Sequence, residues 1–442
     1  MKIIYFINPY KKVLCIIPDF LKKIYLKKKY YLLPENKFIR NIIIFFYIKI
    51  LRKFFVLINL LLTVKFRWGN PKKFKFIIFD NDSMGVIDKI MPKSQYFVLT
   101  TRIQDFKQIF ISKDIIIYLL KNLFKHSLKI NYISCLLKII KPKKIVTIID
   151  NSEDFHIIYK LFKKSNISFY AIQNAVRSKD YYKSIFSISN YSGNYFCFGD
   201  YELNSIKKNL LHTPKLKLKA IGSLRTELAK EYLHKKNKNK INEIYDICLI
   251  SESGSEIGTS GSLSMSNWKD DQRVAAKILR YTLLFCKKYN KKLLFLGRHN
   301  LKKGNNELIK KEEFLFYKYK NKIDDFNKSF FDKSKYDNIK NLLQSNVIIG
   351  QTSTLLRESF GLKKKILVCD WAIRKNKEDF NTDAFPNGII KLRSQTYQNF
   401  EKRLLKILKI NNKNYLSKIS KPNLIYNLDF KTLNFLRNEM LK

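Results

Sequence analysis

The chain has 442 residues, of which 46% are hydrophobic, including 34 Phe and 26 Tyr, so it can build buried cores and is not an intrinsically disordered protein. Its formal net charge of +50 comes mainly from lysine, since 72 Lys accompany 14 Arg. Because Lys, Ile, Asn, Phe and Tyr are over-used together, as in A/T-rich coding sequence, this charge is weak evidence for a polyanion partner. No nucleic-acid partner is expected.

Residues 1–73 form a basic, apolar segment that we expect to be helical. Residues 1–75 hold 18 Lys or Arg and two acidic residues. The longest uncharged run there, 54–64, is shorter than the roughly 18 apolar residues that a membrane-spanning helix needs. Two interpretations stay open: core helices with lysine-coated outer faces, or peripheral contact with the inner face of the membrane.

The six cysteines are scattered without C-x-x-C spacing, which is typical of reduced, buried thiols rather than disulfides or a zinc site. The N-terminus interrupts its apolar stretches with lysines and lacks a small-residue cleavage site, so no signal peptide is predicted. We therefore expect a cytoplasmic protein, with no metal site and no cofactor.

A β/α alternation begins at residue 74. Apolar runs that end in polar residues occupy 74–80, 95–101, 144–150, 167–174, 194–200 and 216–223. Runs that are apolar on both faces are typical of parallel strands covered by helices on two sides. Residues 74–223 are therefore predicted to form an N-terminal β/α domain, with its polar strand ends at the sheet edge where such folds bind ligands.

Residues 224–243 lack Gly and Pro and are predicted to be a linker helix. A second alternating series, 244–442, is predicted to form a C-terminal β/α domain. Its expected strands lie at 245–251, 291–299, 346–350 and 366–369, its helices at 270–289 and 335–344, and closing helices follow from 394. The fold class is thus α/β, with two Rossmann-like domains facing a crevice.

The stretch "NVIIGQTSTLLRESFG", 346–361, places a hydroxyl-rich turn between a strand and a helix. The free N–H groups and dipole of such a helix start attract a phosphate, and Thr352, Ser353 and Thr354 can donate hydroxyls to it. Glu358, one turn inside, can accept hydrogen bonds from ribose. The alternative is that Ser353 or Thr354 is a plain N-cap and Glu358 a solvated partner of a lysine.

Two further strand ends in this domain carry candidate phosphate contacts. Arg298 and His299 end "FLGRHN", as a cation and a ring donor. Ser251 and Ser253 open the loop "SESGSEIGTSGS", which is neither a Rossmann nor a Walker loop. This loop wraps a phosphate or sugar, or is merely a flexible connection.

The segments "IIDN", "AIQNAVRS", "FCFGDYE", "AIGSLR" and "LLRESFG", within 74–410, resemble bacterial surface carbohydrate biosynthesis proteins. These are similar to GT-B glycosyltransferases, including users of cytidine-nucleotide Kdo-type or sialic-type sugars, and more distantly to glycerol-phosphate polymerases. The chain departs from them at His299-Asn300, where His-Pro is common, and at Ala175, where Gly is common.

The resemblance implies a nucleotide-sugar donor, a glycan or glycolipid acceptor, and glycosyl transfer. It places the nucleotide site on Arg298, His299, Thr352, Ser353, Thr354 and Glu358. It places the acceptor and catalytic side on Asp150, Asn151, Gln173, Asn174 and Arg177.

An acceptor hydroxyl needs a base, and the leaving phosphate needs its charge neutralised. Asp150 is the first candidate for the base and Glu153 the second, both in "IIDNSEDFH". The structural alternative for Asp150 is an N-cap of the following helix. Asp80 and Asp82 have the D-x-D spacing of metal-dependent GT-A enzymes. A second complete β/α domain favours a metal-independent GT-B enzyme instead.

Three function classes therefore stay open. The leading one is a glycosyltransferase for a surface polysaccharide or glycolipid precursor, with a CMP-linked Kdo- or nonulosonic-type sugar favoured as donor. A nucleotide-sugar epimerase or a glycerol-phosphate-type transferase would share the fold. A non-catalytic, basic scaffold for membranes or polyanions would bind polyanions in a salt-dependent way and show no nucleotide preference.

Overall fold

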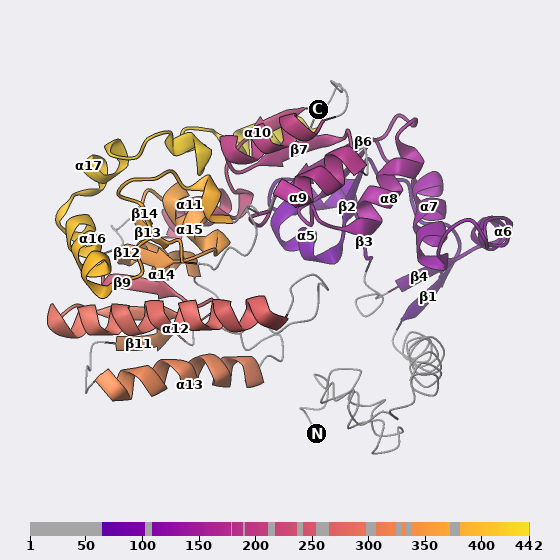
Figure 1. The fold of residues 1–442 in the computed structure, drawn as a ribbon. Helices are drawn as coiled ribbons and strands as arrows, with labels where there is room; N and C mark the ends of the chain where they lie inside the picture. The colour runs from indigo at the N-terminus through magenta and orange to yellow at the C-terminus, as the bar shows by residue number, and fades with distance from the viewer. Residues whose placement is uncertain are drawn as a thin grey trace, which may run out of the picture. The chain divides into compact units, whose positions relative to one another are not determined.

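The computed structural model describes residues 64–101, 108–177, 179–188, 191–210, 217–236, 242–252, 265–297, 306–323, 329–332, 338–371 and 381–441 (Figure 1). The chain divides into two compact units. The main unit comprises residues 74–97 and 142–442 and carries two six-stranded sheets; the small unit contains the described residues before 74 together with 98–141.

The first sheet has the strand order β3-β2-β5-β6-β7-β8. In that order the strands are Tyr96–Leu99, Phe76–Phe79, Lys144–Thr147, Ser168–Ile172, Asn194–Cys197 and Leu218–Ala220. Neighbouring strands in the series β2-β5-β6-β7-β8 pair in parallel. All four residues of β2 are fully buried, as expected for a strand covered on both faces.

The second sheet is also parallel, with the order β11-β10-β9-β12-β13-β14. Its strands are Ser329–Asp332, Leu293–Leu296, Tyr245–Ile250, Ser345–Gly350, Lys365–Cys369 and Lys391–Leu392. The central strands β9 and β12 bury Ile247, Val347, Ile348 and Ile349 completely. Each such side chain contributes about 1.5–3 kcal/mol by leaving water.

Helices connect these strands. Those of the main unit are α5 Asn81–Ile87, α8 Glu153–Phe162, α9 Lys179–Tyr182, α10 Asp200–Asn209, α11 Leu224–Lys236, α12 Met265–Lys288, α13 Asn306–Ile323, α14 Asn338–Leu343, α15 Thr354–Gly361, α16 Tyr397–Lys409, α17 Asn412–Ser417 and α18 Thr432–Leu441. A π-helical segment, Lys183–Ile188, extends α9. Both sheets thus have the Rossmann-like β/α pattern expected from the sequence.

The two sheets of the main unit are tied by a buried ion pair. Arg357 of α15 pairs with Glu202 of α10, with Nη2 2.7 Å from Oε2, and neither side chain is exposed. After α17 the chain returns to the first sheet, where the Asn427 N–H donates to the carbonyl of Phe198 at 3.0 Å. The Thr432 hydroxyl, at the start of α18, donates to the carbonyl of Ile221.

The small unit corrects one expectation. Residues Lys65–Trp68 form strand β1, paired in parallel with β4, Gln108–Ile111, so the predicted helix is wrong at this point. The alternation of charged and aromatic residues in "KFRW" has the period of a strand rather than a helix. Helices α6, Lys113–Lys121, and α7, Leu128–Ile140, follow. The rest of the N-terminal segment, 1–63, lies outside the described residues.

The sequence predicted the strands of the first sheet and four of the second, while β11 and the helix α13 were not anticipated. The two-residue strand β14 lies in "NGIIKL", a stretch of the alternating series that was not assigned to a helix or a strand. Cys135, Cys197, Cys248, Cys286 and Cys369 are buried and free, which confirms the prediction for these five. Within the described ranges, no helix combines the length and the apolar composition needed to cross a membrane.

Candidate functional site

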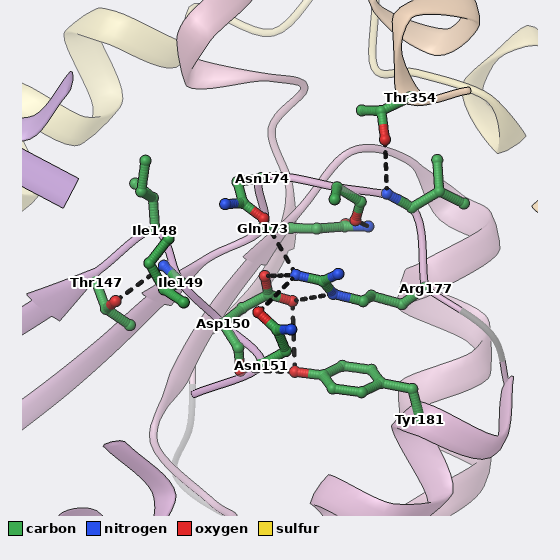
Figure 2. A network of polar contacts seen from close by, with 12 residues as sticks. Thr147, Ile148, Ile149, Asp150, Asn151, Gln173, Asn174, Arg177, Tyr181 and Thr354 are labelled. Carbon is green, nitrogen blue, oxygen red and sulfur yellow. Dashed lines mark hydrogen bonds and ion pairs between the residues drawn. The ribbon is translucent and has the colours of Figure 1, made fainter. Parts of the chain in front are cut away.

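The first polar cluster lies beyond β5 and β6, where Asp150 and Arg177 form a two-point ion pair (Figure 2). Arg177 Nη2 is 2.6 Å from Asp150 Oδ1, and Nε is 3.1 Å from Oδ2. Nη2 also lies 3.1 Å from the side-chain oxygens of Asn151 and Asn174. The structure therefore brings together four of the five residues that the resemblance placed on the acceptor side.

Tyrosines complete the surroundings of Asp150. The Tyr195 hydroxyl donates to Asp150 Oδ2 at 2.8 Å, and the Tyr181 hydroxyl donates to its carbonyl at 2.6 Å. Burial, and then the Asp150 charge, raise the pKa of both tyrosines well above the usual value, so they remain donors. Burial alone would lower the pKa of Arg177, but the charge of Asp150 raises it, so the guanidinium stays protonated.

Gln173, the fifth acceptor-side residue, is buried and holds the loop after β6. Its Oε1 accepts from the Phe198 N–H at 3.0 Å and its Nε2 donates to the Ala175 carbonyl at 2.8 Å. Ala175 is not among the described residues with positive φ, so the loop here does not need the glycine of the related proteins. The next residue, Val176, donates its N–H to the Thr354 hydroxyl at 3.1 Å, which links this loop to the start of α15 (Figure 2).

Ser152 is the N-cap of α8, and its hydroxyl accepts from the Phe155 N–H at 3.3 Å. The alternative interpretation of Asp150 as the N-cap is therefore wrong, because Ser152 has that position. Glu153, the second candidate base, is solvent-exposed in the first turn of α8. Of the two candidate bases, Asp150 has no exposed side-chain surface and Glu153 is accessible.

The second polar cluster is the start of α15, and a carboxylate of the chain itself occupies it. Glu252, which follows β9, accepts from the N–H groups of Gln351, Thr352 and Ser353 at 2.7–3.0 Å. The Thr352 hydroxyl adds a fourth donor at 2.6 Å. The donors at the helix start thus have an oxyanion partner within the chain, the carboxylate of Glu252.

Beside Glu252 lies a cavity of about 10 Å³, lined in part by Ser251, Gly350 and Gln351. A space of this size holds about one water molecule. Another oxyanion could reach these N–H groups only if the Glu252 side chain left them.

The predicted residues of α15 have distinct partners. Ser353 is the N-cap of the helix, with its hydroxyl accepting from the Leu355 N–H at 3.3 Å, which confirms that part of the alternative interpretation. Glu358 is buried and accepts from the Ser223 hydroxyl at 3.0 Å, so its interpretation as a solvated partner of a lysine is wrong. Burial raises the pKa of Glu358, although the Ser223 hydroxyl and then the charge of Arg225 act in the lowering direction.

The remaining predicted nucleotide contacts divide into two groups. Ser253, Arg298 and His299 lie outside the described residues. Ser251 is buried at the end of β9, and its hydroxyl donates to the carboxylate of Glu312 on α13. The sequence did not indicate that Glu312 lies beside this site.

Asp80 of the D-x-D pair has a local structural role. It is the N-cap of α5, with Oδ1 accepting from the Asp82 N–H at 3.1 Å, and it adopts a φ of 79°. Among the described residues, no group of three or more His, Cys, Asp or Glu side chains has the arrangement of a metal site.

Sequence reasoning missed Glu252, Tyr181 and Tyr195. Glu252 had a usable signal, because it lies directly after a predicted strand at the same sheet edge as the α15 turn. The tyrosines had none, since Tyr195 lies inside an apolar strand and Tyr181 in a stretch with several similar tyrosines.

No protein-family model matches this chain, and no curated protein matches it in sequence. Solved structures do resemble it. A UDP-GlcNAc 2-epimerase from Neisseria meningitidis bound to UDP-GlcNAc has a TM-score of 0.51 at 12% identity, over 83% of this chain and 98% of that one. The UDP-GlcNAc 2-epimerase of Methanocaldococcus jannaschii has a TM-score of 0.50 at 13% identity, over 84% and 100%. Anabaena Alr3699/HepE in complex with UDP and glucose has a TM-score of 0.47 at 8% identity, over 83% and 99%.

These similarities, with the two parallel Rossmann-like sheets, show an α/β fold of the GT-B kind. The GT-A alternative drawn from Asp80 and Asp82 is therefore wrong at the level of the fold.

Proposed function

We propose that this chain is a nucleotide-sugar glycosyltransferase of the GT-B kind. The observation that carries the proposal is the start of α15, where three N–H groups and the Thr352 hydroxyl converge on one oxyanion. A phosphate oxygen of a nucleotide requires the same set of donors. Glu252 holds this place when no donor is bound, and the donor phosphate replaces its carboxylate.

The second sheet then supplies the nucleotide site. Ser353 keeps α15 capped, so that its N–H groups stay directed at the phosphate. Arg298 and His299, which follow β10, are proposed to neutralise the leaving phosphate. Ser251 and Ser253 are proposed to line the same edge, and Glu358 to contact ribose, which requires it to exchange its bond with Ser223.

The first sheet supplies the acceptor side, with Asp150 and Arg177 acting as a positioning pair. Asp150 is bound by a guanidinium and a tyrosine hydroxyl, which leaves its oxygens poorly placed to remove a proton. We therefore assign the base to Glu153, the exposed one of the two candidates. Arg177, with Asn151 and Asn174 beside it, orients the acceptor.

In the proposed step the acceptor hydroxyl oxygen bonds to the anomeric carbon and its proton passes to the Glu153 carboxylate. The bond from the anomeric carbon to the phosphate oxygen breaks, and the nucleotide leaves with the electron pair. Fixed donors at the helix start stabilise the negative charge that develops there. No metal ion is needed for this scheme, so activity should withstand a chelator.

Within this class we favour a CMP-linked Kdo- or nonulosonic-type donor and a hydroxyl of a surface polysaccharide or glycolipid precursor, on the basis of the sequence resemblance. We propose that the reaction takes place in the cytoplasm. The second candidate is an epimerase acting on a free UDP-sugar, because two of the solved structures that resemble this chain, with TM-scores of 0.51 and 0.50, are UDP-GlcNAc 2-epimerases.

The test is a thermal-shift screen of the full chain with CMP, CDP, UMP, UDP and GDP. A ligand that binds the folded state alone raises the melting temperature by mass action. Thr352→Val and Ser353→Ala should reduce the shift caused by the preferred nucleotide. Ser417→Ala, at the end of α17, is the matched control and should leave it unchanged.

A shift with cytidine nucleotides would support the transferase, and sugar release that requires an acceptor would identify it. A shift with UDP, with interconversion of a free UDP-sugar in the absence of acceptor, would select the epimerase. The proposal fails if no nucleotide shifts the melting temperature while heparin does so in low salt, since that is the behaviour of a polyanion-binding scaffold.

A further inference from the structure

The small unit carries an apolar patch on α6, in the turn that follows, and at the first residue of α7. This α6–α7 patch consists of Ile116, Ile117, Leu120, Leu123, Phe124 and Leu128, all of which are exposed. Phe124 is 98% exposed and Leu120 68%. Ile115 and Ile130 on the same helices are buried, so the helices have a separate core face. Contiguous exposed apolar patches of this kind mark interaction surfaces.

The turn is fixed from within, so the patch is presented by ordered backbone. Asn131, buried on α7, donates through Nδ2 to the carbonyl of Asn122 at 2.6 Å and to that of His126 at 3.1 Å. These two bonds span the segment that carries Leu123 and Phe124. A buried amide that satisfies two turn carbonyls is costly to remove, which keeps both apolar side chains directed outward.

Lysines accompany the patch. Lys113, Lys121 and Lys125 are exposed and Lys129 is half-buried, while Asp114 is the single acidic residue of the segment 113–129. Apolar side chains combined with lysines on one helical segment are typical of surfaces that lie in the interface of an anionic membrane.

The neighbouring strand adds an interfacial side chain. Trp68 of β1 is 82% exposed, and β1 pairs with β4, which ends just before α6. Tryptophan is enriched at the boundary between lipid headgroups and acyl chains.

We propose that the α6–α7 patch docks on an anionic lipid surface, with Leu120, Leu123 and Phe124 entering the headgroup–acyl boundary and the lysines meeting the headgroups. A second copy of this chain fits the patch less well, because it would bring two sets of lysines together. The α6–α7 patch itself lies outside residues 1–73, for which the sequence alone suggested membrane contact, although Trp68 belongs to that segment. The proposal does not depend on the proposed enzymatic activity.

Insertion is tested with the full chain and a Phe124→Trp variant. Vesicles of phosphatidylcholine are compared with vesicles of equal parts phosphatidylcholine and phosphatidylglycerol, each with and without brominated acyl chains. We expect the added fluorescence to shift to the blue and be quenched by brominated lipid in the anionic vesicles, less so in high salt. Phe314→Trp is the matched control, because Phe314 is 68% exposed on α13 of the main unit, and its added fluorescence should not be quenched.

A second measurement separates this site from any other lipid contact of the chain. Leu120→Ser combined with Phe124→Ser should weaken the affinity for anionic vesicles, measured by co-sedimentation, about tenfold, because each substitution removes apolar area from the contact. The Phe314→Ser control should sediment like the unchanged chain. Three results would overturn the proposal. The first is that brominated lipid does not quench the Phe124→Trp variant. The second is a dimer, seen in light scattering, that the double substitution dissociates. The third is that Phe124→Trp is shielded from an aqueous quencher without lipid, which would mean that another part of the chain covers the patch.

Discussion

Two carboxylates follow central strands of the two sheets, and they are bound in different ways. Asp150, after β5, is held by the charged Arg177 and by the Tyr195 hydroxyl. Glu252, after β9, is held mainly by backbone N–H groups at the start of α15. A guanidinium left without its carboxylate is an unpaired buried charge, whereas neutral N–H groups can accept another oxyanion. We therefore propose that the first carboxylate is structural and that the second is exchangeable.

The largest effect should come from Asp150→Ala. Removing one partner of a buried ion pair leaves the other uncompensated and typically costs about 3–5 kcal/mol. Arg177 would lose its charged partner and Tyr195 its acceptor. We expect a strong drop in the melting temperature, and a smaller one for Asp150→Asn, which keeps an acceptor oxygen.

Glu153→Ala is the matched control for this substitution. Because Glu153 is exposed, its removal should change the free energy of unfolding by no more than about 0.5 kcal/mol. Under the proposed mechanism it should nevertheless abolish most of the transferase activity. A stable Asp150→Ala variant, or an active Glu153→Ala variant, would contradict the division of roles.

An intermediate effect is expected for Glu252→Gln. The substitution weakens the contacts at the start of α15, and loss of a helix-capping interaction costs about 0.5–2 kcal/mol. A neutral amide competes less well than a carboxylate for the N–H groups of Thr352 and Ser353, so the nucleotide should bind about tenfold more tightly.

Calorimetric titration with the nucleotide chosen by the thermal-shift screen checks both parts of this expectation. Glu401→Gln, on α16, is the matched control and should leave nucleotide affinity unchanged. If Glu252→Gln lowers stability and nucleotide affinity falls or stays the same, Glu252 is a structural cap and the phosphate binds elsewhere.

The sequence was sufficient for the architecture because apolar strands buried on both faces have a local signature. Strands such as β2 and β12 are uninterrupted apolar runs that end in polar residues. β11 was missed because its segment, "SFFD", is short and follows a long helix that was also not predicted.

The composition of the site was less predictable than its location. The strand ends that carry Asp150 and Thr352 were identified from the sequence, and the resemblance grouped Arg177 with Asp150, but the partners of Thr352 and Glu358 were not identified. Glu252 lies 100 positions from Thr352, and Ser223 lies 135 positions from Glu358. Such pairings depend on which loops the fold brings together, and no local pattern specifies them.

The smallest effect concerns pH and Glu358. Burial raises the pKa of this carboxyl above its ordinary value, so the folded protein binds a proton that the unfolded chain releases. The stabilisation is complete below the unfolded pKa and is lost as the pH rises through the folded one. Glu358→Gln keeps an acceptor for Ser223 and removes the titration. The free energy of unfolding of this variant, relative to the unchanged chain, should therefore rise between pH 4 and pH 7 by about 1.4 kcal/mol for each unit of pKa shift. Melting temperatures of both proteins across this pH range measure the effect.

Glu439→Gln should show the opposite trend. Burial acts to raise the pKa of Glu439, but the hydrogen bond and charge of Lys217 lower it overall, so its stabilisation appears above the unfolded pKa. Equal slopes for the two variants would mean that burial does not raise the pKa of Glu358.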